Sequence, residues 1–241
     1  MIDIKIIPVL EDNYCYVITD INTQISAIID PGDSAPIIGA VKKMGIQPRF
    51  IINTHFHWDH TDGNLAVKEA FDCKIVGPAA EADKIPGIDV TLADGQIFTL
   101  GNTKIKAVET PGHTLGHICL WIESEAVLFS GDTLFSMATG RLFEGTAEQM
   151  FQSLSWIKSL PPQTQIYFGH EYTMENAEFS LTVEPDNLAL QKRYKDVCAT
   201  IKSGGFTSPV SLQTELETNL MLNAQSAEAY GTLRAAKDNY D

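Results

Sequence analysis

Three of the six histidines of this 241-residue chain lie in one short run, His55-Phe56-His57-Trp58-Asp59-His60. On an extended or tightly turning segment, residues two apart project to the same side, so His55 and His57 can bind one ion. Asp59 and His60 then face a neighbouring position. The spacing therefore predicts a metal site. The alternative is a polar loop that caps a following helix, but three protonated imidazoles in such a loop would repel one another.

Three further candidate ligands follow strand-like segments later in the chain, and each comes directly after a glycine: His113, Asp132 and His170. Glycine allows the backbone to turn sharply and to aim the next side chain beyond the edge of a sheet. Each residue alone has a simpler explanation, because histidines after turns are commonly hydrogen-bonded and Gly-Asp is a common turn pair. Together with the histidine run, the three residues favour one shared site.

We expect these residues to hold two ions: His55, His57 and His113 on one, Asp59, His60 and His170 on the other, and Asp132 bridging both. Nitrogen and oxygen ligands suit zinc first, with iron or manganese as alternatives. Two cations about 3.5 to 4 Å apart can share a water and lower its pKa until hydroxide is present at neutral pH. The expected nucleophile is this hydroxide, which Asp59 and Asp132 orient as ligands.

The elements that must position these ligands are short strands followed by helices. β-like runs are predicted at residues 2–9, 15–19, 24–29, 50–52, 74–76, 97–100, 104–108, 117–122, 126–129 and 165–168. Helices are predicted at residues 35–44, 62–71 and 147–159. After about Met174 helical windows, such as residues 175–181 and 187–202, dominate to the end of the chain. This pattern predicts two packed sheets covered by helices over residues 1–173, followed by an all-helical domain over residues 174–241.

Composition limits the possible partners. With 17 basic and 31 acidic residues, the net charge of -14 opposes binding to nucleic acid or to an anionic membrane, so an anionic substrate needs a local basic cluster. The sequence has no apolar stretch long enough for a membrane helix and no basic, apolar leader, so we expect a cytoplasmic protein. Four scattered cysteines form no C-x-x-C pair, and Cys119 fits strand packing better than a catalytic role.

The motifs resemble the metallo-β-lactamase superfamily and, within it, glyoxalase II, the hydroxyacylglutathione hydrolases. The metal run alone is typical of the superfamily. The narrower resemblance rests on later segments as well, namely Asp12-Asn13-Tyr14, Pro111-Gly112-His113-Thr114, Ser130-Gly131-Asp132-Thr133-Leu134-Phe135, Phe143-Glu144-Gly145-Thr146, His170-Glu171-Tyr172-Thr173, Glu184-Pro185-x-Asn187 and Arg234-x-x-Lys237-Asp238.

This resemblance implies an αββα sandwich with a C-terminal helical domain, and hydrolysis of S-D-lactoylglutathione to glutathione and D-lactate in methylglyoxal detoxification. It implies that Arg141 and Tyr172 contact the glutathione backbone, with Phe143 at a neighbouring position of the substrate site. Arg234 and Lys237 would hold the glycine carboxylate of glutathione. From spacing alone, these last two would instead form a solvated helix face. A monomer is expected.

Some positions depart from the family pattern. Phe56 stands where a third, non-ligating histidine is usual, Phe143 where tyrosine is common, and Asn223 where the helical domain usually has arginine. These changes concern packing and substrate contacts and leave the expected ligands intact. Alternative functions are another thioesterase, a lactonase or a mononuclear-iron persulfide dioxygenase of the same superfamily, or a catalytically silent metal-binding protein.

Overall fold

The computed structural model describes residues 1–240, which form two compact units. The first unit contains Met1–Glu109 and Gly116–Val127. The second contains Thr110–Leu115 and the chain from Leu128 onward. The boundary predicted between residues 173 and 174 follows the change from strands to helices, whereas the compact units divide the chain much earlier. The second unit consequently combines strands with the C-terminal helices.

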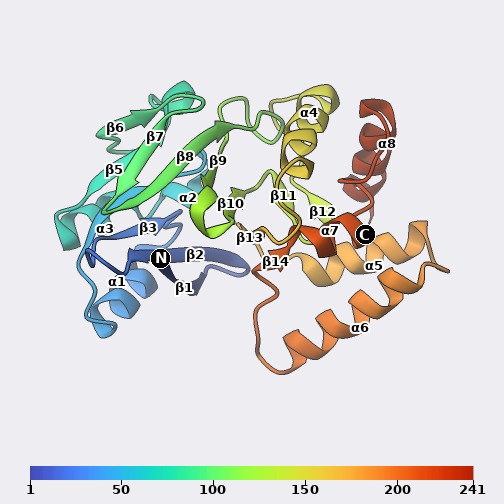
Figure 1. Cartoon of the computed structure of the whole chain (residues 1–241), viewed down its shortest axis with the longest axis horizontal. Coiled ribbons are helices and arrows are strands. Elements are labelled where there is room, and N and C mark those ends of the chain that lie inside the picture. The colour runs from blue at the N-terminus through green and yellow to red at the C-terminus, as the bar shows by residue number, and fades with distance from the viewer. Residues whose placement is uncertain (241) are drawn as a thin grey trace. The chain divides into compact units, whose positions relative to one another are not determined.

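The first unit is built on a six-stranded mixed sheet in the order β1-β2-β3-β4-β5-β6. β1 to β3 are antiparallel, and β3 to β6 run parallel. Two helices, α1 (Ser34–Lys43) and α3 (Asn64–Phe71), cover one face of this sheet (Figure 1). The strands are β1 (Ile2–Val9), β2 (Asn13–Asp20), β3 (Ser26–Ile29), β4 (Pro48–Ile52), β5 (Lys74–Pro78) and β6 (Val90–Leu92).

Alternation along these strands explains the core of the first unit. Val17, Ile28 and Ile51 point to the side where Ile37 and Val41 of α1 are buried, because successive strand residues face opposite sides of a sheet. α1 begins where the Asp33 carboxylate accepts a hydrogen bond from the backbone N–H of Ala35. The apolar face of the helix therefore meets the apolar face of the sheet.

The first unit also holds a three-stranded antiparallel run, β7-β8-β9. These strands are β7 (Ile97–Leu100), β8 (Thr103–Glu109) and β9 (Ile118–Ile122). The rings of Phe50 on β4 and Phe98 on β7 meet edge to face, with centroids 4.9 Å apart. Cys119 is fully buried in β9, which confirms its predicted place in a strand core. Short helices lie at α2 (Trp58–Thr61), η1 (Ala79–Glu81) and η2 (Glu123–Glu125).

Strands of the second unit are neighbours in the order β14-β13-β10, and a separate two-stranded hairpin is formed by β11 and β12. Helices α5 and α6 lie side by side, as do α4 and α8 (Figure 1). The elements are β10 (Val127–Gly131), β11 (Leu134–Phe135), β12 (Ala138–Thr139), α4 (Ala147–Lys158), β13 (Gln165–Phe168), α5 (Thr173–Val183), α6 (Leu188–Lys202), β14 (Val210–Ser211), α7 (Leu212–Thr218) and α8 (Ala227–Asp238).

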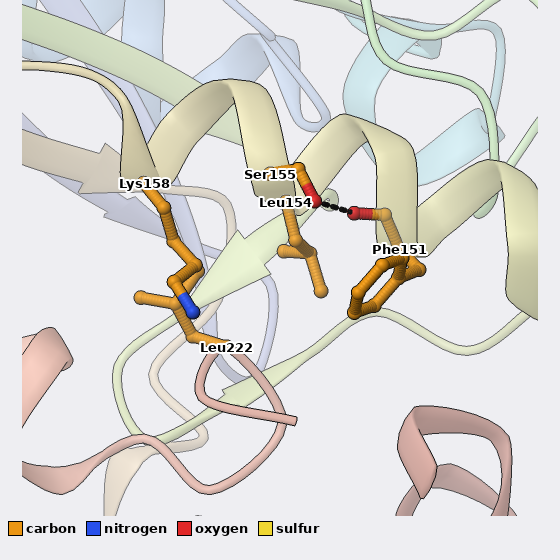
Figure 2. A pocket seen from close by; sticks show the side chains of 5 residues that line it. All are labelled: Phe151, Leu154, Ser155, Lys158 and Leu222. Carbon is orange, nitrogen blue, oxygen red and sulfur yellow. Dashed lines mark hydrogen bonds between the residues drawn. The ribbon is translucent and has the colours of Figure 1, made fainter. Parts of the chain in front are cut away.

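Helix α4 begins at a capping box, in which Thr146 accepts from the backbone of Gln149 while the Gln149 side chain accepts from Thr146. Further along, α4 lines a small pocket together with Leu222 of the C-terminal segment (Figure 2). Its lining is mostly apolar, apart from Lys158 and Ser155. The Ser155 hydroxyl donates to the Phe151 carbonyl 2.7 Å away, so it is satisfied within the helix.

The prediction that β structure ends near Met174 is wrong, because Val210–Ser211 forms β14 and pairs with β13. A two-residue strand has too little alternation to be recognised in a sequence. β6, the β11–β12 hairpin and α2 also lie outside the predicted elements, whereas α7 and α8 fall within the predicted helical region without having been assigned bounds. Among the described residues, no helix is both long enough and apolar enough to cross a membrane.

Candidate metal centre

The histidine run begins three residues after the end of β4 and passes into the short helix α2. Asn53 and Thr54, which connect the strand to the run, are fully buried, as is His55, and His60 is almost so. His57 occupies the position before the first turn of α2. The run is therefore fixed at both ends, by a central strand and by a helix.

Asp30, directly after β3, lies beside Thr54, just before the histidine run, and beside His60 within it. Its carboxylate accepts from the Thr54 backbone N–H at 2.8 Å and from the Thr54 hydroxyl at 2.7 Å. Because that hydroxyl donates to Asp30, it can accept from Nδ1 of His55, 3.0 Å away. Nδ1 of His60 lies 3.1 Å from the Asp30 carboxylate. In the His55 ring Nε2 then carries the lone pair that a metal needs.

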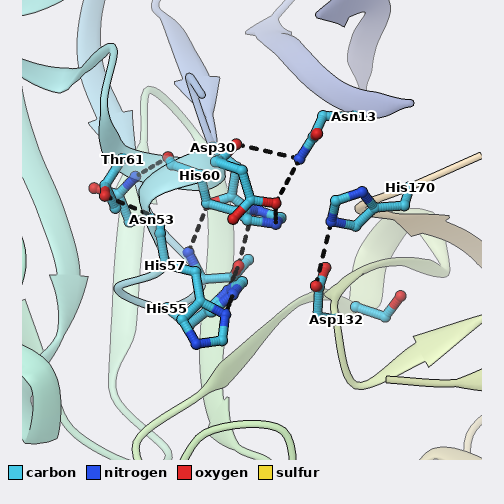
Figure 3. Close-up of polar contacts among 12 residues, drawn as sticks. Asn13, Asp30, Asn53, His55, His57, His60, Thr61, Asp132 and His170 are labelled. Carbon is cyan, nitrogen blue, oxygen red and sulfur yellow. Dashed lines mark hydrogen bonds and ion pairs between the residues drawn. The ribbon is translucent and has the colours of Figure 1, made fainter. Parts of the chain in front are cut away.

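The three histidines of the run lie close together (Figure 3). Nε2 of His55 is 3.1 Å from Nδ1 of His57, close to the separation of about 3.3 Å that two nitrogens have on one tetrahedral zinc ion. Nε2 of His60 is 3.5 Å from the Asp59 carboxylate. The Asn13 amide donates to that carboxylate at 3.0 Å and holds it in place. The first unit thus presents a half-site of three imidazoles and one carboxylate.

The second unit presents another half-site around Asp132, which directly follows β10. Oδ2 of Asp132 lies 3.4 Å from Nε2 of His113 and 3.3 Å from Nε2 of His170. The predicted sharp turns occur at two of the three preceding glycines, since Gly112 and Gly131 have φ of 156° and 48°. All three residues are buried. One carboxylate oxygen between two imidazole nitrogens is an arrangement that suits a cation.

Neighbouring groups set the orientation of the rings in this second half-site. Nδ1 of His113 donates to the carbonyl of Arg141 at 2.8 Å, which leaves Nε2 as the ligand atom. The His170 ring is stacked on Tyr172, with centroids 4.7 Å apart and planes 5° from parallel. Phe135 meets the His170 ring edge to face. Phe143 meets the His113 ring at 5.2 Å and is itself 64% exposed, so it can contact a bound molecule.

The predicted basic residues lie near one another in the second unit. Arg234 is only 5% exposed and donates to the Thr139 carbonyl at 2.6 Å. The alternative interpretation, in which Arg234 lies on a solvated helix face, is therefore wrong. It also pairs with Asp238 at 2.8 Å. Arg141 lies 3.4 Å from the same carboxylate and is largely exposed. Burial lowers the pKa of Lys237, and the charges of Arg234 and Arg141 lower it further, against the opposing effect of Glu175.

Phe56, the residue that departs from the family pattern in the run, packs against the core of the first unit. Its ring is covered by the Lys84 ammonium group, 4.1 Å from the ring centroid, and its backbone N–H donates to the buried Glu81 carboxylate. A phenyl ring at this position therefore acts on packing and leaves the ligand set of the run complete.

Sequence reasoning missed three residues that orient the candidate ligands: Asp30, Asn13 and Glu81. Asp30 and Glu81 are buried carboxylates that accept backbone hydrogen bonds next to the histidine run. The signal for Asp30 was its position directly after a buried strand, before Pro31-Gly32. Asn13 lies far from its partner Asp59 in the sequence, and only its place in the Asp12-Asn13-Tyr14 motif marked it.

Two family models match the chain and together span most of it. The metallo-beta-lactamase superfamily model matches residues 9–170, and the model of the hydroxyacylglutathione hydrolase C-terminus matches residues 171–240. A hydroxyacylglutathione hydrolase of Methylococcus capsulatus is 45% identical over 95% of this chain and 89% of its own length. One of Pelagibacter ubique is 40% identical over 99% of this chain and 100% of its own length.

Solved structures agree on the fold. ETHE1 from Myxococcus xanthus superposes with a TM-score of 0.76 at 22% identity, over 99% of this chain and 92% of that chain. The B3 metallo-beta-lactamase BLEG-1 has a TM-score of 0.65 at 28% identity, over 70% of this chain and 91% of that chain. These similarities confirm the predicted metallo-β-lactamase fold with a helical C-terminal part.

Proposed function

The chain belongs to the hydroxyacylglutathione hydrolase family of the metallo-β-lactamase superfamily, and from this we propose that it hydrolyses 2-hydroxyacyl thioesters of glutathione. The proposed substrate is S-D-lactoylglutathione, and the products are glutathione and D-lactate. The observation that carries the proposal is the similarity to hydroxyacylglutathione hydrolases along nearly the whole chain, including the C-terminal residues 171–240. This similarity favours the proposed reaction over the lactonase and dioxygenase alternatives.

We propose that the two half-sites bind the same pair of divalent cations. His55, His57 and His113 would hold one ion, Asp59, His60 and His170 the other, and Asp132 both. Support comes from each half-site separately. The Nδ1 contacts of His55 and His113 leave Nε2 free to bind a metal, and the carboxylate oxygens of Asp59 and Asp132 lie 3.3 to 3.5 Å from the Nε2 atoms of neighbouring histidines. An all-nitrogen and oxygen donor set suits zinc, which is the proposed metal.

Bound divalent cations would supply the Lewis acidity that lowers the pKa of a water molecule and polarises the thioester carbonyl. The protein's own contribution is to orient the groups that would bind the cations. Asn13 holds the Asp59 carboxylate at a fixed angle through bonds to its side chain and its backbone carbonyl. Thiolate is a good leaving group, so no side chain needs to act as a separate acid. Asp59 and Asp132 are proposed as ligands that orient the attacking oxygen.

Substrate binding is proposed for the basic residues and aromatic rings of the second unit. Arg141 is an exposed cation and Lys237 a half-buried one, in a chain with a net charge of -14, and a glutathione conjugate is anionic. Arg234 and Lys237 are proposed to hold the glycine carboxylate, with Arg141 on the glutathione backbone, although Arg234 also bonds to Thr139 and Asp238. Tyr172 and Phe143 are proposed to contact the tripeptide and the acyl group beside the rings of His170 and His113.

The deciding experiment measures thioester cleavage and metal content on the same preparation. The assay compares S-D-lactoylglutathione with an acyl-coenzyme A thioester and a simple lactone. We expect selective cleavage of the glutathione conjugate and two ions per chain by elemental analysis. A preparation with one iron per chain that consumes oxygen with a persulfide would contradict the proposal. A fully loaded preparation that cleaves none of the compounds would support a silent metal-binding protein.

Two further proposals concern the setting of the enzyme. We propose a monomer, because the expected ligands and the basic cluster all come from one chain. The cytoplasm is the proposed location, since the scattered cysteines of the sequence form no disulfide framework. Sedimentation of the purified protein tests the first proposal, and fractionation of cells tests the second.

A further inference from the structure

The β11–β12 hairpin contains none of the proposed ligands, yet it lies between two parts of the proposed site. Asp132 comes two residues before β11, and Arg141 comes two residues after β12. The connection between the two strands is Ser136-Met137, and Met137 has φ of 65°. A non-glycine residue in this conformation is strained and persists only where surrounding groups hold it. The hairpin therefore needs external support.

Glu215 of α7 supplies that support at the tip of the hairpin. Its carboxylate accepts from the Met137 backbone N–H at 2.7 Å and from the Ser136 hydroxyl at 2.9 Å. Asn219, one turn later, donates to the same carboxylate at 2.9 Å and to the carbonyls of Phe135 and Ala138 at 3.3 and 3.1 Å. Glu215 is fully buried. Together these two side chains satisfy polar groups on both strands of the hairpin.

The other C-terminal helices bind the same hairpin. Asn176 of α5 donates to the Ser136 carbonyl at 3.0 Å, and Arg193 of α6 donates to the Ser136 hydroxyl oxygen at 3.2 Å. From α8, the Tyr230 hydroxyl lies 2.9 Å from the Thr139 hydroxyl and Arg234 donates to the Thr139 carbonyl. Each of α5, α6, α7 and α8 thus contributes at least one hydrogen bond to residues 135–139.

The hairpin is in turn packed against two proposed ligands. Gly140, directly after β12, lies so close to Asp132 that a Cβ atom on it would overlap the Asp132 backbone oxygen, and the same atom would be 3.0 Å from Nδ1 of the His113 ring. The next residue, Arg141, offers the carbonyl that accepts from His113 Nδ1. A displacement of β12 would therefore move both the backbone of Asp132 and the acceptor that orients His113.

We infer that Glu215 is a positioning residue of the metal site, which acts through the β11–β12 hairpin on Asp132 and His113. The inference rests on the proposed function, because it takes these two residues as metal ligands. It assigns the C-terminal helices a second task besides substrate binding, namely to fix ligand geometry. Residues that orient metal ligands commonly change metal affinity by about 10- to 100-fold when they are replaced.

The length of the Glu215 side chain, more than its charge, is what the hairpin needs. Burial raises the pKa of Glu215, and the bonds from Met137, Asn219 and Ser136 and the charge of Arg193 act in the opposite direction. Glutamine can reproduce the contacts: its oxygen can accept from both Met137 and Asn219, while its amide donates to the Ser136 hydroxyl oxygen. Aspartate keeps the charge but withdraws the acceptors by about 1.5 Å, the length of one carbon–carbon bond.

The test compares Glu215→Asp with Glu215→Gln. Metal release to a chromogenic chelator is measured by stopped flow on the loaded proteins, together with amide hydrogen exchange of the peptide covering residues 132–141. We expect Glu215→Asp to release metal at least about 10-fold faster and to exchange faster in this peptide. We expect Glu215→Gln to stay within about twofold of the parent protein in both measurements.

Asp20→Asn is the matched control. Asp20 is also a buried carboxylate that accepts several hydrogen bonds, but it joins the end of β2 to the β7–β8 turn and touches no proposed site residue. This variant should lower the melting temperature and leave metal release unchanged. If Glu215→Asp released metal no faster than the parent, the inference would fail. It would also fail if Asp20→Asn accelerated metal release equally, because the effect of Glu215→Asp would then come from general destabilisation of the fold.

A second variant covers the case in which Glu215→Asp does not fold. Ser136→Ala removes one of the three donors to Glu215 and leaves the carboxylate in place. It should accelerate metal release in the same direction, and a rate equal to that of the parent would overturn the inference. Failure of the proposed function is distinguishable, because a parent protein that holds two ions but cleaves no thioester would still permit every measurement of metal release.

Discussion

The backbone oxygen of Asp132 lies against Cα of Gly140, at a distance that leaves no room for a side chain on the glycine. Gly32 stands in the same relation to Asp59 in the first unit, where an added Cβ would overlap the Asp59 backbone oxygen. Both carboxylates of the proposed ligand set are therefore backed by a glycine. The absence of a side chain at these two positions allows the ligand-bearing backbone to approach a neighbouring segment closely.

Gly140→Ala should displace Asp132, because the methyl group would overlap its carbonyl and also press on the His113 ring. We expect loss of metal and a fall in thioesterase activity of at least about 10-fold. The matched control is Gly39→Ala on the exposed side of α1, where an added Cβ meets nothing within 4 Å. That change should instead stabilise the protein by about 0.5–1 kcal/mol. Elemental analysis and thermal unfolding of both variants check the prediction.

Asp132→Ala should remove the proposed bridging ligand, release metal and abolish turnover, because two imidazoles would lose the carboxylate between them. Asp3→Ala is a suitable control, since Asp3 pairs with Lys5 at the surface and both side chains are about half exposed. The measurement is metal content and initial rate on the same sample. Full activity with both ions bound in Asp132→Ala would refute the bridging role.

Lys237→Gln should weaken substrate binding more than catalysis. The removed charge would contact the glycine carboxylate, far from the reacting carbon, so we expect KM to rise about 10-fold while kcat changes less than about twofold. Lys192→Gln, an exposed position on α6, changes the net charge equally. Steady-state kinetics at low and moderate salt separate the two. If both variants raise KM to the same extent, the rise comes from the change in net charge and not from a contact of Lys237 with the substrate.

The pH dependence of stability should carry a contribution from Asp20. The Thr103 hydroxyl, with further bonds from Thr23 and Asn102, lowers the pKa of Asp20 from 3.8 to about 2. The folded protein therefore holds this carboxylate ionised where the unfolded chain binds a proton. This contribution is fully present above the unfolded pKa and is lost as pH falls through the folded pKa.

Thermal unfolding of the parent and of Asp20→Asn between pH 7 and pH 2.5 checks this expectation. The parent should be the more stable protein by a constant margin above about pH 5, and the margin should shrink between about pH 4 and pH 2. A difference in melting temperature that stays the same across the whole range would show that the Asp20 carboxylate contributes through its shape and not through its ionisation.

Much of the first unit could be predicted from the sequence, because its strands are long enough to show alternation. In the first unit, β1 and β7 occupy the same residues as the predicted runs. In the second unit, β13 does so as well, and α4 begins at the predicted residue. β14 and the β11–β12 hairpin escaped recognition, since strands of two residues contain no period to detect. α7 is seven residues long and carries a fully buried acid, which in a sequence resembles a solvated helix face.

The candidate site shows the same division. Histidines and aspartates that follow strands can be recognised by their type and spacing. The structure groups those of the histidine run in the first unit and the other three in the second unit, and their meeting around one pair of ions stays a prediction. The residues that orient these ligands cannot be recognised by type and spacing. Asp30 acts on a run more than twenty residues later, and Glu215 acts on a hairpin 78 residues earlier in the chain. Such pairings depend on the folded path of the backbone, which composition and period do not encode.

The bonds from four helices to one hairpin bear on how this enzyme can be recombined. The two family models meet between residues 170 and 171. A natural design for a chimera would therefore replace the residues after 170 with the C-terminal segment of a relative that has another substrate specificity. Such a chimera would leave the tip at Ser136 and Met137 without its acceptor unless the incoming segment brought an equivalent of Glu215. Donor segments should therefore be chosen by what they offer this hairpin before they are chosen by what they bind.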